Sequence, residues 1–452
     1  MASPAVSAKK LAQSLPLILV VALCLRLAFV WDYQTQTPHR NLSALPFLFE
    51  SGNIAYSLAS GRGFGSPFRA DTGPTAWMTP IYPLMLAGIM RVFGIYTFAS
   101  WVAAVTMNVS FSTLACIPLY FAGKRIAGTG LGAGAAWLWA IFPNAILLSF
   151  QSLWDTSLSA FLGATVLWAT LKLAETDSDR AWTLYGLLWG IVIMTNAAVL
   201  SLFPFLAGWA AWRSRQHILR NVALACGIMA LCCVPWTVRN YHVFHAFIPL
   251  RSTLGLQLWV GNNADAHVIW LGEQHPIHDN AERDRYIQMG EIAYMAEKEK
   301  GAVAYILSFP RHEAELIAGR FVMFWSGGSL HPIDDFIHNR SLWFRYVLLF
   351  NICLALGALA GIIVLIRKRS IYAFPLAVGP IVFPFAYYLT LSFPRYRHPI
   401  DPVLMLLTAI TLSGFSRRAI PASPEPSGAL PPASKSGLRA ARLRSRSKPS
   451  RT

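Results

Sequence analysis

The side chains best placed to do chemistry in this sequence are two acids that stand apart from other charges. Glu50 is the only charged residue between Arg40 and Arg62, in the stretch FLFESGNIAYSLASGRGFGSPF. A carboxylate in such a position can act as a general base, which takes the proton from a hydroxyl or amine as that group attacks. Asp155, in SLWDTSLSAFL, is either a second acid of the same site or the N-cap of a helix that begins after it.

Basic side chains in three later stretches predict a site for an anion. The stretches are PWTVRNY, the segment around Arg251, and PRYRHP. A planar guanidinium pairs with two phosphate oxygens at once, so arginine suits a phosphate ligand. The alternative is that these side chains only reach lipid headgroups while their stems stay in apolar surroundings. The candidate phosphate-binding residues are Arg239, Arg251, Arg395, Arg397 and His398.

The composition indicates what must position these residues. Hydrophobic side chains make up 55% of the 452 residues and charged ones only 13%, which is far more apolar than a soluble protein. In lipid every backbone polar group must be paired within its own segment, so a run of about 20 apolar residues predicts a membrane-spanning helix. The sequence predicts an all-α polytopic membrane protein with about ten transmembrane helices. The runs lie near 11–31, 98–122, 128–150, 156–173, 182–195, 197–212, 221–238, 345–366, 371–392 and 402–415.

Lys and Arg residues at the ends of these runs predict the orientation. They collect at every second connection, for example at Lys124 and Arg367, on the same side as Lys9. Short cytoplasmic loops carry such a positive excess, so both termini are expected in the cytoplasm of a protein of the inner cell membrane. The loops 32–97 (the first outer loop) and 241–343 (the cap) then lie outside, in the periplasm or extracellular space, and the two candidate acids share that face.

Two short membrane-surface helices are expected in the first outer loop. Residues 46–60 can form one, ended by the glycines that follow, with Glu50, Asn53 and Ser57 in one polar stripe. A second helix after Pro80 is too short to cross the bilayer comfortably and is expected to lie at its surface.

The cap has the composition of a soluble domain and is expected to be a small group of helices. Residues 281–300 place Tyr286, Met289 and Ala293 on one stripe of a single helix, with charges elsewhere. A second helix is expected to follow Pro310.

These features divide the chain into four predicted parts. They are an N-terminal membrane module, 1–240, with a catalytic first outer loop, the outer cap, C-terminal transmembrane helices, 344–416, and a disordered basic cytoplasmic tail, 417–452. The tail holds nine Lys and Arg residues against one acid, which is a large share of the net charge of +17. Such a tail is drawn to anionic membrane lipids, and without stacking aromatics it predicts no nucleic-acid partner.

The order of several motifs resembles that of a known family of membrane enzymes. After one N-terminal span come the acid-bearing region with IAYSLASGRGFGSPF and then TGPTAWMTPIYPLMLAG. SLWDTSLSAFL, VPWTVRNYHVFHAFIPLRSTLGLQLWVGNN and FPRYRHPIDPVLMLL follow in that order. This succession, over most of residues 11–415, resembles glycosyltransferase family 39, which includes protein O-mannosyltransferases and lipid A aminoarabinose transferases.

The resemblance implies a C-type glycosyltransferase fold and inverting transfer of a hexose or pentose from a polyprenyl-phosphate-sugar donor to an unknown acceptor. It gives Glu50 the role of the family's catalytic base, about one helical turn later relative to the Ile-Ala pair, which keeps the same helix face. Asp155 becomes an auxiliary acid, and the basic residues hold the donor's phosphate. Asn53, Tyr82 and Asn262, which lie in or beside the matching motifs, are expected to bind substrate.

A divalent metal ion is compatible with this class of enzyme, but the sequence shows no convincing ligand set and predicts no other cofactor. His275 and His278 lie close together, and two histidines alone do not make a metal site. Two other classes of function stay open. In a lipid or solute transporter Glu50 and the arginines would line a path, although the internal repeat of many transporters is not evident. In a non-catalytic membrane scaffold the cap would bind a partner.

Overall fold

The structure is a computed structural model that describes residues 11–36, 47–214, 217–270, 272–339 and 341–414. Within these ranges the secondary structure is helical, with an isolated bridge between Gly65 and Pro74 in place of strands. The prediction of an all-α protein is therefore confirmed. The predicted basic tail, 417–452, lies outside the described residues.

Five helical segments are long and apolar enough to cross a membrane by length and composition, among the residues that the structure describes. One of these segments is divided at Ala115 into α5 (Phe98–Leu114) and α6 (Cys116–Ala127). The five are Leu15–Gln36 (α2), Phe98–Ala127, Thr156–Leu173 (α9), Ile218–Phe244 (α12) and Leu342–Arg367 (α18).

The other predicted spans form shorter or interrupted helices. Proline accounts for two of the interruptions because it has no N–H to donate to the preceding turn. Pro143 begins α8 after α7 has ended, and Pro384 separates α19 from α20. The segments are α7 (Thr129–Ala140), α8 (Pro143–Leu147), α10 (Asp179–Thr195), η2 (Ala197–Leu202), α11 (Phe203–Ser214), α19 (Ala373–Val382), α20 (Phe385–Leu389) and α22 (Asp401–Gly414).

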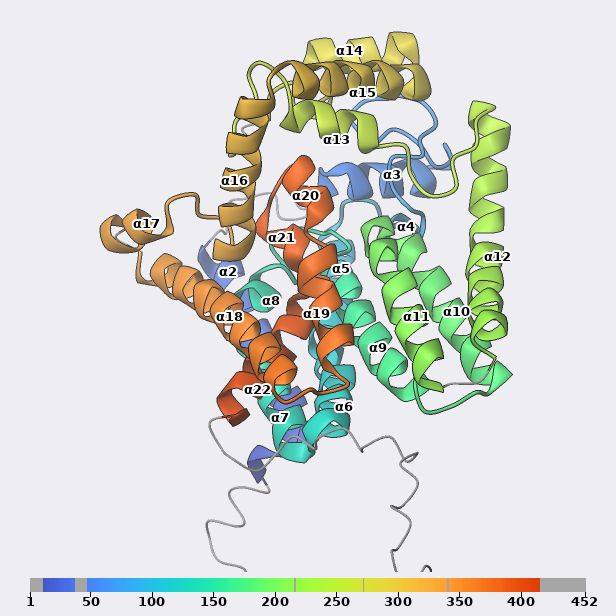
Figure 1. Ribbon diagram of the computed structural model, residues 1–452. Coiled ribbons are helices and arrows are strands. Elements are labelled where there is room, and N and C mark those ends of the chain that lie inside the picture. Colours follow the sequence, from blue (N-terminus) through green and yellow to red (C-terminus); the bar gives the residue numbers. More distant parts are fainter. Residues whose placement is uncertain (1–10, 37–46, 215–216, 271, 340, 415–452) are drawn as a thin grey trace, which may run out of the picture.

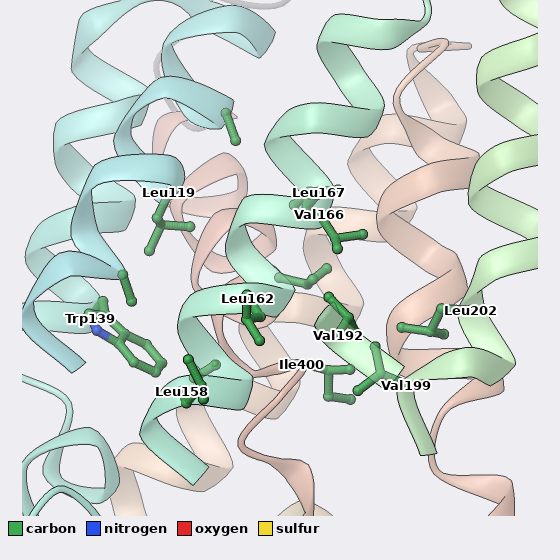
Figure 2. Close-up of a cluster of buried hydrophobic side chains, with 14 of the residues drawn as sticks. Leu119, Trp139, Leu158, Leu162, Val166, Leu167, Val192, Val199, Leu202 and Ile400 are labelled. Carbon is green, nitrogen blue, oxygen red and sulfur yellow. The ribbon is translucent and has the colours of Figure 1, made fainter. Parts of the chain in front are cut away.

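The apolar core of the bundle lies around α9 (Figure 2). Leu158, Leu162 and Val166 recur every four residues, so they form one stripe along this helix. The stripe packs among buried side chains of α6 and α10, such as Leu119 and Val192. Because α9 is packed on several sides, the residues at its N-terminus, such as Asp155, have a fixed position.

The outermost helices present apolar side chains to their surroundings. Leu231 of α12 is 64% exposed, and Leu356 of α18 is 61% exposed. Apolar surface on long helices of this hydrophobicity suits lipid and not water. The chain is therefore a multi-pass membrane protein.

A second group of helices covers one end of the bundle (Figure 1). Both described ends of the chain lie at the opposite end. Among the described residues, the first outer loop contributes the two predicted short helices, and the cap contributes five. They are α3 (Glu50–Ala59), α4 (Ile81–Phe93), α13 (Leu254–Gly261), α14 (Asn280–Met289), α15 (Glu291–Ser308), α16 (Pro310–Ser326) and α17 (Pro332–His338).

The predicted single helix over 281–300 is wrong. Gly290 has a φ of +76°, a left-handed conformation that ends α14 and begins α15 in a new direction. The predicted stripe is broken with the helix: Tyr286 is buried, whereas Ala293 is exposed. Tyr294 takes the buried position beside Tyr286, with ring centroids 5.4 Å apart.

Candidate active site

A cavity of about 350 Å³ lies at the covered end of the bundle, where the first outer loop meets the cap. Segments far apart in the sequence build its wall: the start of α3, the loop before α4, the N-terminus of α9, the segment leading into α13, and the chain from α20 to α22. Four of the candidate residues line it, namely Glu50, Asp155, Arg251 and Arg395. The structure therefore brings both predicted acids together with two of the predicted basic side chains.

Glu50 is the first residue of α3, and its side chain is 19% exposed. The helix is fixed by its own polar residues: the Ser51 hydroxyl donates to the Leu153 carbonyl at 2.8 Å, and Asn53 Nδ2 donates to the Pro67 carbonyl at 2.8 Å. Asn53 is buried and lies outside the cavity wall. It therefore positions the helix that carries Glu50, and we do not keep it among the proposed substrate contacts.

The glycine-rich turn after α3 brings the chain back over the site. Gly61 and Gly63 have φ values of +78° and +87°, which favour glycine because other residues carry a Cβ. The reversal lets the following chain pair with itself at Gly65 and Pro74. As a result the segment from Trp77 to Thr79 reaches the cavity wall.

Asp155 precedes α9 at the N-cap position, but its side chain makes no capping hydrogen bond. The carboxylate accepts a hydrogen bond from the Ser159 hydroxyl at 3.0 Å. The alternative that Asp155 is simply a helix cap is therefore not supported. Burial raises the pKa of the Asp155 carboxyl above its usual value, although Ser159 and the charges of Arg251 and Arg395 act in the opposite direction.

A close contact sets the distance between α9 and the segment that carries Arg395. A Cβ on Gly163 of α9 would overlap the carbonyl of Pro399, so only glycine lets the two backbones approach this closely. Pro399 itself lines the cavity. The contact thus holds α9 against the segment that carries Arg395.

Arg251 and Arg395 line the cavity with most of their N–H groups unpaired. Arg251 Nε donates to Thr253 Oγ1 at 2.8 Å, and Arg395 Nη2 lies 3.4 Å from the Tyr396 hydroxyl. The described residues provide no further acceptor for either side chain. The Arg395 guanidinium lies over the Trp154 ring, 3.7 Å from its centre, which fixes its plane without using its donors. Both can therefore bind an anion.

Arg239, by contrast, holds the backbone of the first outer loop. Its two terminal nitrogens donate to the carbonyls of Thr75 and Phe64 at 2.7 and 2.6 Å, and one of them also donates to Asn240 Oδ1 at 3.0 Å. Arg239 lies outside the cavity wall. With three of its five N–H groups used in this way, it fastens the loop to α12, and its position outside the cavity argues against a phosphate-binding role.

Arg397 and His398 are also outside the cavity and buried. Arg397 donates to Asp401 at 2.7 Å, to the carbonyls of Phe324 and Trp325 and to Asn351. His398 Nδ1 lies 3.0 Å from the second oxygen of Asp401. The group ties the start of α22 to its neighbours, so neither basic residue stays in the proposed phosphate site.

Tyr82 and Asn262 are placed away from the cavity wall as well. The Tyr82 hydroxyl donates to Asn108 at 3.1 Å, which joins α4 to α5. Asn262 accepts from Arg320 at 3.0 Å and donates to the Leu389 carbonyl at 2.8 Å. Both are structural contacts in this arrangement and not substrate contacts.

A contact that the sequence did not reveal fastens the cap to the first outer loop. Buried Glu291, at the start of α15, accepts from the Ala76 N–H and the Ser252 hydroxyl, each at 2.7 Å, and from the Tyr286 hydroxyl at 2.6 Å. It also accepts from the Thr75 hydroxyl. In the sequence Glu291 is one of many acids of a charged helix, so no local signal marks it.

A second hollow of about 380 Å³ shares part of its wall with the cavity. Glu50 and Arg395 line both spaces, and aromatic side chains such as Trp270 and Phe393 line the second. Glu50 and Arg395 therefore lie between the two spaces.

The residues present do not fit a metal ion well. No group of three or more His, Cys, Asp or Glu side chains is placed to hold one among the residues that the structure describes. The nearest pair at the site is Glu50 with His275, whose Nε2 lies 3.9 Å from Glu50 Oε1. Two protein ligands fall short of the sets that hold a catalytic zinc.

No family model and no curated protein sequence matches the chain. Solved structures of the oligosaccharyltransferase AglB from Archaeoglobus fulgidus do. They include a complex with Zn and sulfate, a complex with an inhibitory peptide and a dolichol-phosphate, and a form tethered to an acceptor peptide. Each is 14% identical to the chain and covers 88% of it, with TM-scores of 0.51 to 0.52. The chain spans about half of the length of these proteins, 49–50%. The predicted fold class, a polytopic helical membrane protein of the C-type glycosyltransferase fold, is thereby confirmed.

Proposed function

We propose that the protein is a membrane glycosyltransferase that moves a hexose or pentose from a polyprenyl-phosphate-sugar donor to an acceptor outside the membrane. The observation that carries the proposal is the composition of the cavity wall. Two carboxylates and two arginines with unpaired N–H groups share one space at the end of a membrane bundle. Transfer of a sugar from a lipid phosphate to an acceptor needs such a combination: a base for the acceptor and cationic groups for the phosphate.

In the proposed reaction a hydroxyl or amine of the acceptor attacks the anomeric carbon of the sugar. A bond forms from the acceptor oxygen or nitrogen to that carbon, and the bond from the carbon to the phosphate oxygen breaks. The electron pair leaves with the polyprenyl phosphate, and the acceptor's proton goes to Glu50. Because the attack is on the face opposite the phosphate, a single displacement inverts the anomeric configuration.

Arg251 and Arg395 would stabilise the charge that develops on the phosphate as it leaves. Donors fixed in advance are effective here because they need little reorganisation during the reaction. Arg395 meets this condition through its contact with Trp154. Asp155 would be an auxiliary acid that orients the acceptor from the N-terminus of α9.

The fold likeness supports the donor class, since one of the similar structures contains a dolichol-phosphate. Membership of glycosyltransferase family 39 is part of our proposal and rests on the order of the motifs. The division at 240, 343 and 416, the cytoplasmic position of both termini and the outside position of the cavity are further parts of the proposal. They rest on the apolar runs and on the distribution of Lys and Arg. In the tethered structure the acceptor of the Archaeoglobus fulgidus oligosaccharyltransferase is a peptide.

The test is mass spectrometry of membranes that contain the wild type or Glu50→Gln, supplied with polyprenyl-phosphate sugars. Lipid, glycan and protein fractions are extracted and searched for a mass increase of one sugar. We expect the wild type to form a product, and the rate for Glu50→Gln to fall by about 10²–10⁴-fold because the base is lost. Glu299→Gln, which changes an exposed acid of the cap, is the matched control.

Equal product from the wild type and Glu50→Gln would reject the role of Glu50. Transport of the intact donor without transfer of its sugar would favour the transporter alternative.

A further inference from the structure

His275 of the cap lies beside the proposed base, in a closed aromatic environment. Its side chain is 4% exposed, and its Nε2 lies 3.9 Å from Glu50 Oε1. Phe68, Trp77 and Trp270 meet the imidazole edge-on, with ring centroids 5.5, 5.4 and 5.4 Å away. These rings fix the plane of the imidazole, and Nε2 is the nitrogen that meets the carboxylate.

The backbone determines which nitrogen of His275 carries the proton. The Ile277 N–H donates to Nδ1 at 3.2 Å, so Nδ1 presents its lone pair. A neutral imidazole has one N–H, which must then be on Nε2. Burial, together with His278 and Arg395, lowers the pKa of His275 to about 3, so the ring is neutral at physiological pH.

We propose that His275 is a positioning residue for the base, whose Nε2–H holds one oxygen of Glu50 so that the other faces the acceptor. The proposal rests on the function proposed above. The distance of 3.9 Å is longer than a hydrogen bond, and catalytic contacts of this kind tighten when substrate closes the site. A neutral donor suits this task, because a charged imidazolium would stabilise the carboxylate ion and make it a weaker base.

This arrangement assigns a role to the cap in the reaction. The first outer loop supplies the base, and the cap supplies the group that orients it, which is the usual logic of a base held by a third residue. The same proton position argues against His275 as a metal ligand. A metal needs the lone pair of Nε2, which is protonated as long as Nδ1 accepts from Ile277.

Two substitutions separate the effect of the hydrogen-bond donor Nε2–H from the effect of the aromatic ring. His275→Phe keeps a ring among the aromatic side chains and removes the N–H group. His275→Gln removes the ring and keeps an N–H group near the position of Nε2. We expect kcat for sugar transfer to fall by about 10–100-fold in His275→Phe and by less in His275→Gln. The KM for the polyprenyl-phosphate-sugar should be unchanged in both variants. A residue that only packs would give the opposite order, with Phe the better replacement. His267→Phe, at an exposed histidine of the cap, is the control.

A double-mutant cycle with Glu50→Gln tests whether His275 acts through the carboxylate. If it does, adding His275→Phe to Glu50→Gln causes no further loss of kcat. The same fold loss in both backgrounds would overturn the proposal, and so would wild-type kcat in His275→Phe.

Two further outcomes separate the possible failures. Loss of wild-type activity in EDTA with recovery in Zn²⁺, together with loss of bound zinc in His275→Phe, would make His275 a metal ligand and overturn its role as a donor. Full activity of the single variant Glu50→Gln would show that Glu50 is not the base, and the roles proposed for Glu50 and His275 would both be rejected while the transfer reaction itself would stand. An inactive Glu50→Gln beside a fully active His275→Phe would reject only the role of His275.

Discussion

The arginines of the cavity wall, Arg251 and Arg395, and those of the surrounding structure, Arg239 and Arg397, have the same charge and use their N–H groups in opposite ways. We call the part that holds the second pair the frame. In the frame, Arg239 and Arg397 donate to backbone carbonyls and to buried side chains. At the cavity wall, Arg251 and Arg395 have one hydrogen bond each among the described residues. The fold supplies acceptors to the first pair and leaves the second pair for a ligand.

This contrast distinguishes the basic residues of a motif that can bind phosphate from those that cannot. A guanidinium whose donors are already paired inside the protein must break those bonds before it can bind an anion, and buried donors left unpaired are costly. A guanidinium at a cavity wall with unpaired donors has no such cost. The hydrogen bonds that a basic residue already makes therefore indicate its ability to bind phosphate better than its position near a membrane end does.

The largest expected effect, on stability, tests the frame. Arg397→Ala leaves Asp401 buried without its main partner, and loss of one member of a buried ion pair costs about 3–5 kcal/mol. Thermal unfolding of the detergent-solubilised protein should show a clearly lower Tm. A Tm equal to that of the wild type would show that this guanidinium does not hold the frame.

The next effect tests the cavity wall. Arg395→Ala and Arg251→Ala should each reduce kcat/KM for a polyprenyl-phosphate-sugar donor by about 10²–10³-fold, because a donor to the leaving phosphate is lost. The Tm should stay near that of the wild type, in contrast to Arg397→Ala only two residues away. Arg395→Lys should restore part of the activity, since an ammonium has the charge without the planar fork.

Arg311→Ala is the matched control for these variants, because this side chain is 95% exposed and forms a surface ion pair with Glu315. Unchanged transfer in Arg395→Ala and Arg251→Ala would remove the distinction between wall and frame.

The smallest expected effect concerns Asp155 and pH. Burial raises the pKa of Asp155 in the folded protein, so between its unfolded and folded pKa values the folded state binds more protons than the unfolded state. Stability contributed by this group therefore falls as pH rises through that window. Asp155→Asn should have a higher Tm than the wild type at pH 7, and the difference should shrink as the pH is lowered towards 4.

The activity of the same variant supplies the second half of this test. If Asp155 serves the reaction, Asp155→Asn should be more stable and less active. A Tm gap that does not depend on pH would contradict the assignment of the raised pKa.

The sequence predicted the helices well because their apolar runs are long and their ends are marked by Pro, Gly, Lys and Arg. It failed at Gly290, where one left-handed residue divides a helix whose charge pattern continues across the break. It located Glu50 and Asp155 because isolated acids are rare in so apolar a chain.

The rest of the site depends on tertiary packing. Arg395 and Arg397 belong to one short helix, α21 (Pro394–Arg397), and residues two apart on a helix do not face the same side. The sequence shows that they differ in direction, but only the tertiary structure shows that Arg395 meets the cavity and that Arg397 is paired inside the protein. His275 gains its place beside Glu50 only after the cap has folded onto the first outer loop.

The hydrogen bonds of Glu291 have a consequence for the route by which a ligand arrives. They join α15 to Thr75 and Ala76 of the first outer loop and to Ser252, so the cap is fastened to the two segments that enter the cavity wall at Trp77 and Arg251. Segments fastened in this way are not free to swing away from the cavity as a hinged lid would. A donor whose isoprenoid chain stays in the bilayer is then expected to enter sideways between helices, and its association rate should follow the fluidity of the surrounding lipid.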